Sequence, residues 1–370
     1  MFYSSLRQKA KSLIYNDKYE ANPYRLQKPK ELYSKSFFDA RTWVHDPKHF
    51  VSSGQIAHSP EQPKRVEVLS ESAVNTYCTL ERPTDFGMGP IGDIHSHRYL
   101  RFLQNAFIRW QKSVNSTGEV IPSIHPLLRY HSYPKSAIGQ AGFHQADTSC
   151  PIGQHTWSSA YWSAQSAINL VQHMLDGAQH GYSLHRPPRH HAFAKVAGRF
   201  FLTILQLRRN ISQNAGGGSP FWKSTSIMEM GPKGYSTIAT ISLRYRYMQI
   251  PKFYPFFWGQ ANWCGHGRGY GFNLNLPLAR KTGDEGYLST LRIVLDQIRC
   301  FGPDIIVVAL GLDAAISDPF KGLSITTEGF GKIANNIGKL GKPLAIVQEG
   351  EYLGPELGLN LTRFLKATKA

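Results

Sequence analysis

The sequence predicts an α/β domain with a mainly parallel β-sheet and helices on both of its faces. Two continuous apolar runs, residues 304–310 and 344–347, are typical of strands buried on both sides. Helical patterns at residues 287–301 and 327–340 alternate with these runs, and such alternation indicates parallel neighbouring strands. The chain has 370 residues, 41% of them hydrophobic, which is enough to bury a packed core.

The first 41 residues are basic and show no clear periodicity. We therefore expect a poorly ordered extension, followed by one domain at residues 42–370. Residues 42–44 are expected to form an edge strand, and a polar loop follows them. Helices are predicted at 66–77 and 98–110, because apolar side chains recur there at helical spacing.

The next part of the chain combines a loop, a helix and two strands. Residues 139–151 are small and polar, so we expect a loop there. A helix is predicted at 156–175 with Thr156 as its N-cap, and it leads to a short buried strand at 182–184. Residues 273–278 alternate in polarity and end near a proline, which predicts a further strand.

The chain is strongly basic, with 42 Lys and Arg against 25 Asp and Glu and a net charge of +17. Such an excess often indicates an anionic partner such as nucleic acid. Here much of it lies in the N-terminal extension and in residues 199–250, which hold seven basic residues and one acid, Glu229. No nucleic-acid-binding module is recognisable, so we interpret the extension as a solvated charge run and expect no nucleic-acid partner.

No apolar run reaches the length of a membrane span, and the N-terminal residues lack the apolar segment of a secretory signal. We therefore expect a cytoplasmic protein without a membrane partner. The four cysteines lie far apart and form no Cys-x-x-Cys pair. This spacing indicates free thiols and gives no sign of a disulfide framework or a thiolate zinc site.

The segment at 186–192 reads Arg-Pro-Pro-Arg-His-His-Ala and presents two adjacent imidazoles, His190 and His191. Proline fixes φ and donates no amide hydrogen, so the two prolines form a stiff lead-in. Imidazole titrates near neutrality, which makes a pair on a rigid loop a candidate general base. On these residues alone, a surface histidine pair without a catalytic role is the alternative interpretation.

Together with five other motifs, this segment resembles the zinc-dependent deacetylase family, which includes the histone deacetylases and the bacterial acetylpolyamine amidohydrolases. The other motifs are Ser-Pro-Glu-Gln-Pro-Lys-Arg at 59–65, Ile-His-Ser-His-Arg-Tyr-Leu-Arg-Phe-Leu at 94–103, Ala-Gly-Arg-Phe at 197–200, Leu-Gly-Leu-Asp at 310–313 and Gln-Glu-Gly-Glu-Tyr at 348–352. The second of these is most similar to the acetylpolyamine branch. The resemblance implies a three-layer arginase/deacetylase-like fold.

The resemblance also implies a reaction in which Zn²⁺ polarises an acetamide carbonyl and acidifies a bound water, releasing acetate and an amine. By position, Asp313 is one zinc ligand, His190 of the pair His190 and His191 is favoured as the general base, and Tyr352 donates to the developing oxyanion. In enzymes where one such oxyanion donor has been removed, the transition state loses a few kcal/mol of stabilisation. The expected substrate is a small acetylated amine or an acetyl-lysine, and a homodimer is left open.

Three further residues are expected to contact the substrate. The resemblance implies that Phe200 forms one wall of the acyl tunnel and that the loop with His144 and Asp147 faces its entrance. Glu61, in a polar loop, is the acid expected near a cationic substrate, with an exposed surface glutamate as the alternative.

Two positions depart from the family pattern inside its motifs. Arg189 replaces the glycine before the histidine pair and places a cation beside a metal site, where it would repel the metal. Glu351 replaces the second glycine of the Glu-Gly-Gly-Tyr turn. If that backbone has a positive φ, a side chain costs about 1 kcal/mol there and could displace Tyr352.

The other two zinc ligands of the family are missing. The family carries them in an Asp-x-His element, but the chain has no Asp or His between His191 and His266. We interpret residues 199–250 as translated in a shifted reading frame. Joining the third base of each codon to the first two of the next lets residues 220–231 read Ile-Leu-Glu-Val-Asp-Ile-His-His-Gly-Asn-Gly, the family signature.

The missing ligands predict an impaired or inactive enzyme with weak or no zinc, because one aspartate cannot form a three-ligand site. The anomalous window is also expected to leave a central gap in the sheet and to lower stability. A non-catalytic basic binding protein is one alternative. Another is an active enzyme that recruits different ligands, such as His185 or His266.

Overall fold

The computed structural model describes most of residues 35–369. The described ranges are 35–52, 54–76, 79–113, 116–126, 132–187, 202, 225–230, 244–247, 261–262, 264, 270–271 and 273–369. Across these ranges, no helix combines the length and the apolar composition that crossing a membrane requires.

A mainly parallel sheet is the centre of the fold, as predicted. Within the described residues it has eight strands in the order β4-β1-β5-β10-β9-β6-β7-β8, and each neighbouring pair is parallel. The strands are β1 (Lys35–Phe37), β4 (Thr79–Glu81), β5 (His180–Ser183), β6 (Thr225–Met230), β7 (Arg244–Tyr247), β8 (Asn273–Leu276), β9 (Ile305–Leu310) and β10 (Leu344–Gln348). The predicted strands at 182–184, 273–278, 304–310 and 344–347 correspond to β5, β8, β9 and β10.

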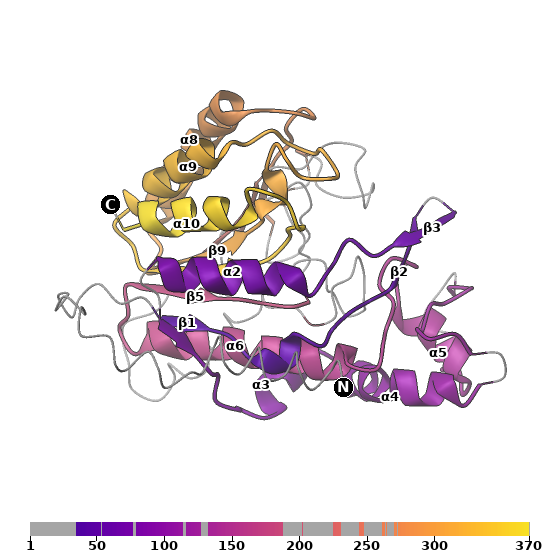
Figure 1. The fold of residues 1–370 in the computed structure, drawn as a ribbon. Coiled ribbons are helices and arrows are strands. Elements are labelled where there is room, and N and C mark those ends of the chain that lie inside the picture. The colour runs from indigo at the N-terminus through magenta and orange to yellow at the C-terminus, as the bar shows by residue number, and fades with distance from the viewer. Residues whose placement is uncertain are drawn as a thin grey trace, which may run out of the picture.

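Helices cover both faces of the sheet and give the three layers seen in Figure 1. One face carries α2 (Lys64–Asn75), α8 (Asp284–Phe301), α9 (Thr327–Gly338) and α10 (Leu357–Ala367). The other carries α3 (Gly89–Gly92), α4 (His97–Gln111), α5 (Ala137–His144) and α6 (Thr156–Leu175). Side chains of β9 alternate between the two cores, with Ile306 and Val308 in the first and Ile305 and Val307 in the second. A strand buried on both faces explains why β9 is continuously apolar.

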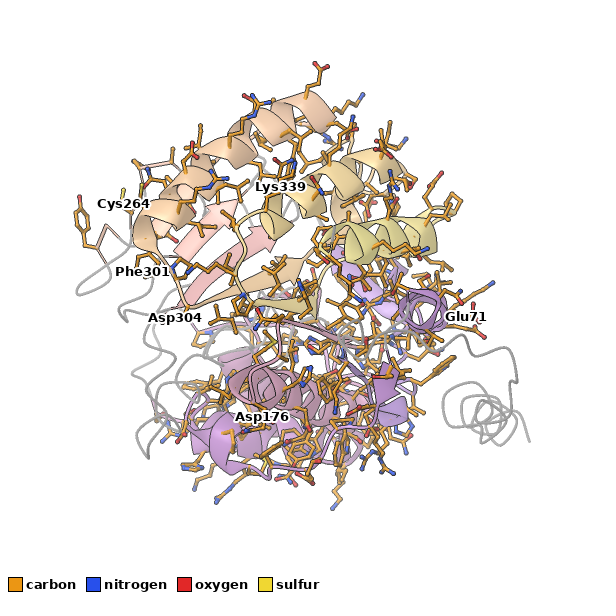
Figure 2. All side chains as sticks on the ribbon, turned by 90° about the vertical axis from the view of Figure 1, so that its left-hand side faces the viewer. Glu71, Asp176, Cys264, Phe301, Asp304 and Lys339 are labelled. Atoms are coloured by element: carbon orange, nitrogen blue, oxygen red, sulfur yellow. The ribbon has the colours of Figure 1, made fainter. Side chains whose placement is uncertain are left out.

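The strands begin and end at opposite edges of this layered structure. Figure 2 looks onto the edge where they begin, with Asp176, Asp304 and Lys339 in the connections that lead into β5, β9 and β10. The strands end at the far edge, and ligands of parallel α/β sheets bind at that kind of edge.

The folded domain begins earlier than the predicted boundary after residue 41. Residues 35–37 form β1, which pairs with both β4 and β5. Residues 42–44 are not an edge strand, because a short 3-10 helix, η3 (Ala40–Thr42), forms there. The Asp39 carboxylate accepts from the Arg41 amide at 2.8 Å, and this local cap outweighs the strand propensity of the sequence. Residues 1–34 lie outside the described part.

The sheet has no central gap at the anomalous window, so that prediction was wrong. Strand β6 lies between β9 and β7, with Thr225 opposite Ile305 and Met230 opposite Leu310. Backbone groups alone make a parallel ladder, so a segment without the family ligands can still complete the sheet.

Two other local predictions were also wrong. The first part of the expected loop at 139–151 is helix α5, capped by Ser136, whose hydroxyl accepts from the Gly139 amide at 3.0 Å. Helix α6 has its predicted bounds, but His155 occupies the N-cap position and Thr156 accepts from the Gly153 amide instead. In the polar segment after residue 44, β2 (His49–Ser52) and β3 (Gln55–His58) form an antiparallel hairpin that projects from the domain in Figure 1.

Candidate active site

Three neighbouring strands end together at one edge of the sheet. Strand β10 pairs with β5 on one side and with β9 on the other. His185 and Arg186 follow β5, Asp313 follows β9, and Tyr352 follows β10. Because these strands are parallel, segments far apart in sequence meet at the edge where ligands of such sheets bind.

Asp313 is fixed by the turn that follows β10. It lies in the 3-10 helix η6 (Leu312–Ala314) and is 3% exposed. The amides of Leu312 and Asp313 both donate to the Gly350 carbonyl, at 2.8 and 3.2 Å. A Cβ at Gly350 would lie 2.6 Å from Asp313 Oδ2, so only glycine permits this approach.

Tyr352 is half-buried beside Asp313's turn. Its ring lies 4.8 Å from that of Phe320, at an interplanar angle of 55°. Among the described non-glycine residues, Lys281 and Lys321 have a positive φ. The backbone of Glu351 is not in this left-handed region. The predicted strain at Glu351 is therefore absent, and its side chain is accommodated by burial instead.

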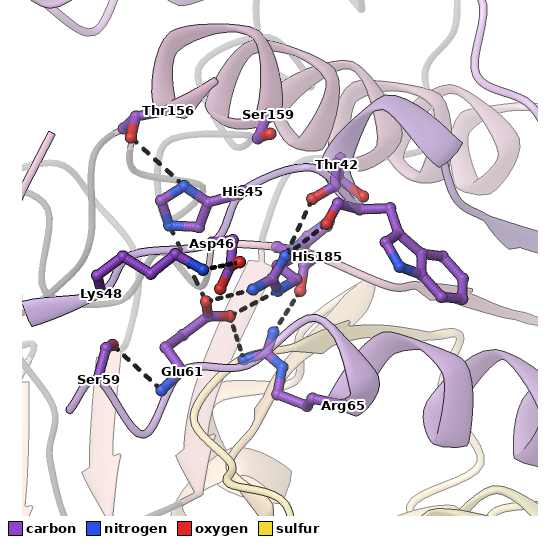
Figure 3. Close-up of polar contacts among 12 residues, drawn as sticks. Thr42, His45, Asp46, Lys48, Ser59, Glu61, Arg65, Thr156, Ser159 and His185 are labelled. Carbon is purple, nitrogen blue, oxygen red and sulfur yellow. Dashed lines mark hydrogen bonds and ion pairs between the residues drawn. The ribbon is translucent and has the colours of Figure 1, made fainter. Parts of the chain in front are cut away.

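A buried network of charged side chains surrounds Glu61 and Arg65 (Figure 3). Arg186 donates to both carboxylate oxygens of Glu61, at 3.0 and 2.9 Å, and Arg65 approaches the same carboxylate at 3.2 Å. Arg65 also donates to the His185 carbonyl at 2.8 Å, and Arg186 to the Trp43 carbonyl at 2.9 Å. The network therefore joins α2, the segment after η3 and the segment after β5.

Burial and pairing decide the charge states in this network. Burial alone would raise the pKa of Glu61, but Arg186 and Arg65 outweigh it and hold the pKa below its ordinary value. Burial lowers the pKa of His45 to about 3, so this imidazole is neutral and its 4.0 Å approach to Glu61 is not an ion pair. Burial also raises the pKa of Glu351 to about 8, against the opposing influence of Arg65 and Gln348.

Glu61 is buried instead of lying on the surface, and Asp147 bonds within its own loop. Glu61 was expected near a cationic substrate or on the surface, but it is 1% exposed and its carboxylate is occupied by two guanidinium groups. Asp147 is half-buried, and its carboxylate accepts from the Ser149 amide at 2.8 Å and from Cys150 Sγ at 3.3 Å. Asp147 thus organises its own loop in the structure.

The expected histidine pair His190 and His191 and the expected tunnel residue Phe200 lie outside the described residues. His185, the alternative ligand, is fully buried, and its Nε2 lies 2.7 Å from the Ser183 hydroxyl. This histidine is thus already engaged inside the domain.

The histone deacetylase domain model matches residues 59–202 and 233–368. The chain belongs to the histone deacetylase family. It is 31% identical over 345 residues to acetylpolyamine amidohydrolase of Burkholderia pseudomallei, covering 89% of this chain and 97% of that protein. It is 29% identical over 333 residues to acetylpolyamine amidohydrolase 2 of Pseudomonas aeruginosa, covering 87% of this chain and 95% of that protein.

The fold agrees with the family. The crystal structure of acetylpolyamine aminohydrolase from Burkholderia pseudomallei superposes with a TM-score of 0.85 at 30% identity, covering 91% of this chain and 99% of that one. The match to the histone deacetylase domain stops at residue 202 and resumes at 233. This interruption falls inside the window 199–250 that departs from the family motifs, and it is narrower than that window.

Members of the histone deacetylase family are generally zinc-dependent, but the described residues of this chain do not fit a zinc ion. Structural and catalytic zinc sites use at least three protein ligands. Within the described ranges, no three His, Cys, Asp or Glu side chains come together as a metal ion requires. Strand β6, beside the strand that leads to Asp313, has the sequence Thr-Ser-Ile-Met-Glu-Met and contains neither Asp nor His.

Arg65 and Arg186 are the residues whose importance the sequence analysis missed. Both stand in motifs quoted for the family resemblance, at 59–65 and 186–192, yet neither was given a role. Charged residues are almost never fully buried unless they are paired. An arginine fixed within a motif was the available signal, but its carboxylate partners could be found only in the fold.

Substitution of Gly350 by alanine tests the contact between the two turns. The added Cβ would clash with the Asp313 carboxylate, so we expect Gly350→Ala to lower the free energy of unfolding by about 1–3 kcal/mol. Gly118→Ala is the matched control, since a Cβ there meets nothing within 4 Å, and it should change stability by less than about 0.5 kcal/mol. Urea denaturation measures both; equal stabilities would contradict the contact.

Acid titration of stability tests the charge network. Folding lowers the pKa of Glu61, so its contribution is complete above the ordinary value of 4.5 and is lost as pH falls through the lower folded value. Glu61→Gln should cost about 3–5 kcal/mol above pH 4.5, because two buried guanidinium groups lose their carboxylate.

The penalty of Glu61→Gln should shrink as the pH falls below 4.5. The control Glu81→Gln breaks the partly exposed pair with Lys35 and should cost less than about 1 kcal/mol. Denaturation at a series of pH values on both sides of 4.5 measures these differences. A Glu61→Gln penalty that stays constant across the series would contradict the assignment.

Proposed function

We propose that this chain is a deacetylase-family protein built to hydrolyse N-acetyl amides of small amines, and that as its sequence stands it binds zinc weakly or not at all and has little activity. The first part rests on family membership and on similarity to relatives named acetylpolyamine amidohydrolases. The second part rests on the residues at the edge of the sheet. Asp313 is the expected zinc ligand there, and the described residues include no group of three side chains that could hold a metal ion.

The observation that supports this proposal is a difference between the two neighbours of β9, which are β10 and β6. On the β10 side, the turn with Gly350 clamps Asp313 and is followed by Tyr352, which supports their assignment as metal ligand and oxyanion donor. On the β6 side, the strand and its flanking residues supply no Asp or His, and none occurs between His191 and His266. A zinc ion lacks two of its three protein ligands in this arrangement.

A shifted reading frame explains this contrast. The alternative translation of residues 220–231 contains the Asp-x-His signature, and those residues include β6 and its lead-in. The interruption of the family match between 202 and 233 covers the same residues. An ordinary accumulation of substitutions would scatter differences along the chain, whereas a frame shift confines them to one window.

Metal content tests the proposed loss of function. We expect the purified protein to carry zinc far below one ion per chain and to release no acetate above background from an N-acetylated diamine or an acetyl-lysine peptide. Asp313→Asn should then leave both values unchanged. The acetylpolyamine amidohydrolase of Burkholderia pseudomallei serves as the positive control. Near-stoichiometric zinc that is lost in Asp313→Asn would contradict the proposal.

The nucleotide sequence from His191 to Pro251 tests the frame shift separately. We expect codons in which the free third bases of residues 220–231 spell the family signature in the alternative frame. Since third bases vary freely in most codons, in-frame codons incompatible with that signature would end this explanation. The metal prediction would stand in either case, because it depends only on the residues present.

A further inference from the structure

Glu351 is a buried acid that replaces the second glycine of the family's Glu-Gly-Gly-Tyr turn. It directly precedes Tyr352 and is 1% exposed. Its backbone shows no left-handed strain, so the side chain is tolerated by the turn. A charged residue is almost never fully buried unless it is paired, so its contacts indicate what it does.

The Glu351 carboxyl group connects three parts of the site. One oxygen lies 2.9 Å from Arg65 Nε, and the other accepts from Gln348 Nε2 at 2.6 Å. Gln348, at the end of β10, in turn accepts from the Tyr182 hydroxyl of β5 at 2.8 Å. Glu351 is therefore linked to α2 by an ion pair with Arg65, and to β5 by hydrogen bonds through Gln348.

Arg65 in turn depends on Glu351. The other carboxylate near Arg65 is Glu61, which Arg186 already engages through both oxygens. Burial acts to lower the pKa of Arg65, but Glu351 and Glu61, followed by Tyr352 and Tyr182, raise it.

We propose that Glu351 is a positioning residue that fixes the Tyr352 turn against the first turn of α2 by an ion pair with Arg65 and a hydrogen bond from Gln348. The proposal rests on the assignment of Tyr352 to the site under the proposed function. It explains the position of Tyr352 by the neighbouring Glu351 side chain, which reaches Arg65. Glycine at this position could make neither contact. The Glu351 side chain therefore adds two contacts that hold this turn.

The experiment follows the environment of Tyr352 directly and needs no activity. The full chain is labelled with 3-fluorotyrosine, and the ¹⁹F resonance of Tyr352 is assigned with Tyr352→Phe. Glu351→Ala removes both contacts and should displace or broaden this resonance. Glu351→Gln retains an oxygen that can accept from Gln348 but loses the ion pair with Arg65, so it should displace the resonance less than Glu351→Ala does.

Two internal controls separate positioning from a general loss of structure. Tyr99 is fully buried on the opposite face of the sheet, so its resonance, assigned with Tyr99→Phe, should stay in place in every variant. Glu328→Ala breaks an exposed pair with Arg363, 2.6 Å apart, and should leave Tyr352 unchanged. If Glu351→Ala does not fold, Glu351→Asp, which withdraws the carboxyl group by one methylene, takes its place and should displace the Tyr352 resonance.

An unchanged Tyr352 resonance in folded Glu351→Ala or Glu351→Asp would overturn the proposal. A joint displacement of the Tyr352 and Tyr99 resonances would also overturn it, because that pattern indicates a general structural role. Neither outcome depends on zinc or on hydrolysis. Failure of this inference is therefore distinguishable from failure of the proposed function, which metal content decides.

Discussion

The buried guanidinium of Arg65 holds together the strand ends on which the site depends. It donates to the His185 carbonyl after β5, pairs with Glu351 after β10, and approaches Glu61 before α2. Removing a cation from water costs several kcal/mol, and this cost is offset only when the surrounding partners are well placed. The three connecting segments are therefore constrained to arrive at Arg65 in one arrangement, and Asp313 is clamped to the β10 turn within it.

The two sides of β9 depend on different kinds of contact. The β9 and β10 side of the site depends on particular residues, since Gly350 leaves room only for the Asp313 carboxylate. The β6 side depends on backbone hydrogen bonds, which most side chains permit. Strand β6 can thus complete the sheet although it contains neither Asp nor His.

Burial pattern made most of the regular structure predictable from sequence. The continuous apolar runs of β9 and β10 and the helical spacing in α2, α4 and α6 follow directly from the two cores that they face. Strand β1 and helix α5 were missed because their short or weakly patterned sequences depend on partners elsewhere and on the Ser136 cap. The local Asp39 cap likewise replaced an expected strand with η3.

The site was predictable only in part, for a related reason. Motifs led us to expect Asp313 and Tyr352 in the site, and both residues follow the ends of parallel strands. The motifs could not show that Glu61 pairs with Arg186, because the two residues are 125 positions apart in the chain. The role of Gly350 was equally hidden, since the space it leaves is defined by a side chain from another turn. Pairings of this kind exist only after folding.

Residues 200–250 contain no Asp or His, although the chain keeps the scaffold of its family. A crystal structure of the full chain grown with excess zinc, with anomalous data at the zinc edge, shows whether a metal binds beside Asp313. We expect no zinc peak there. A zinc ion bound there by carboxylate or imidazole groups, together with ligands from residues 200–250, would contradict this expectation.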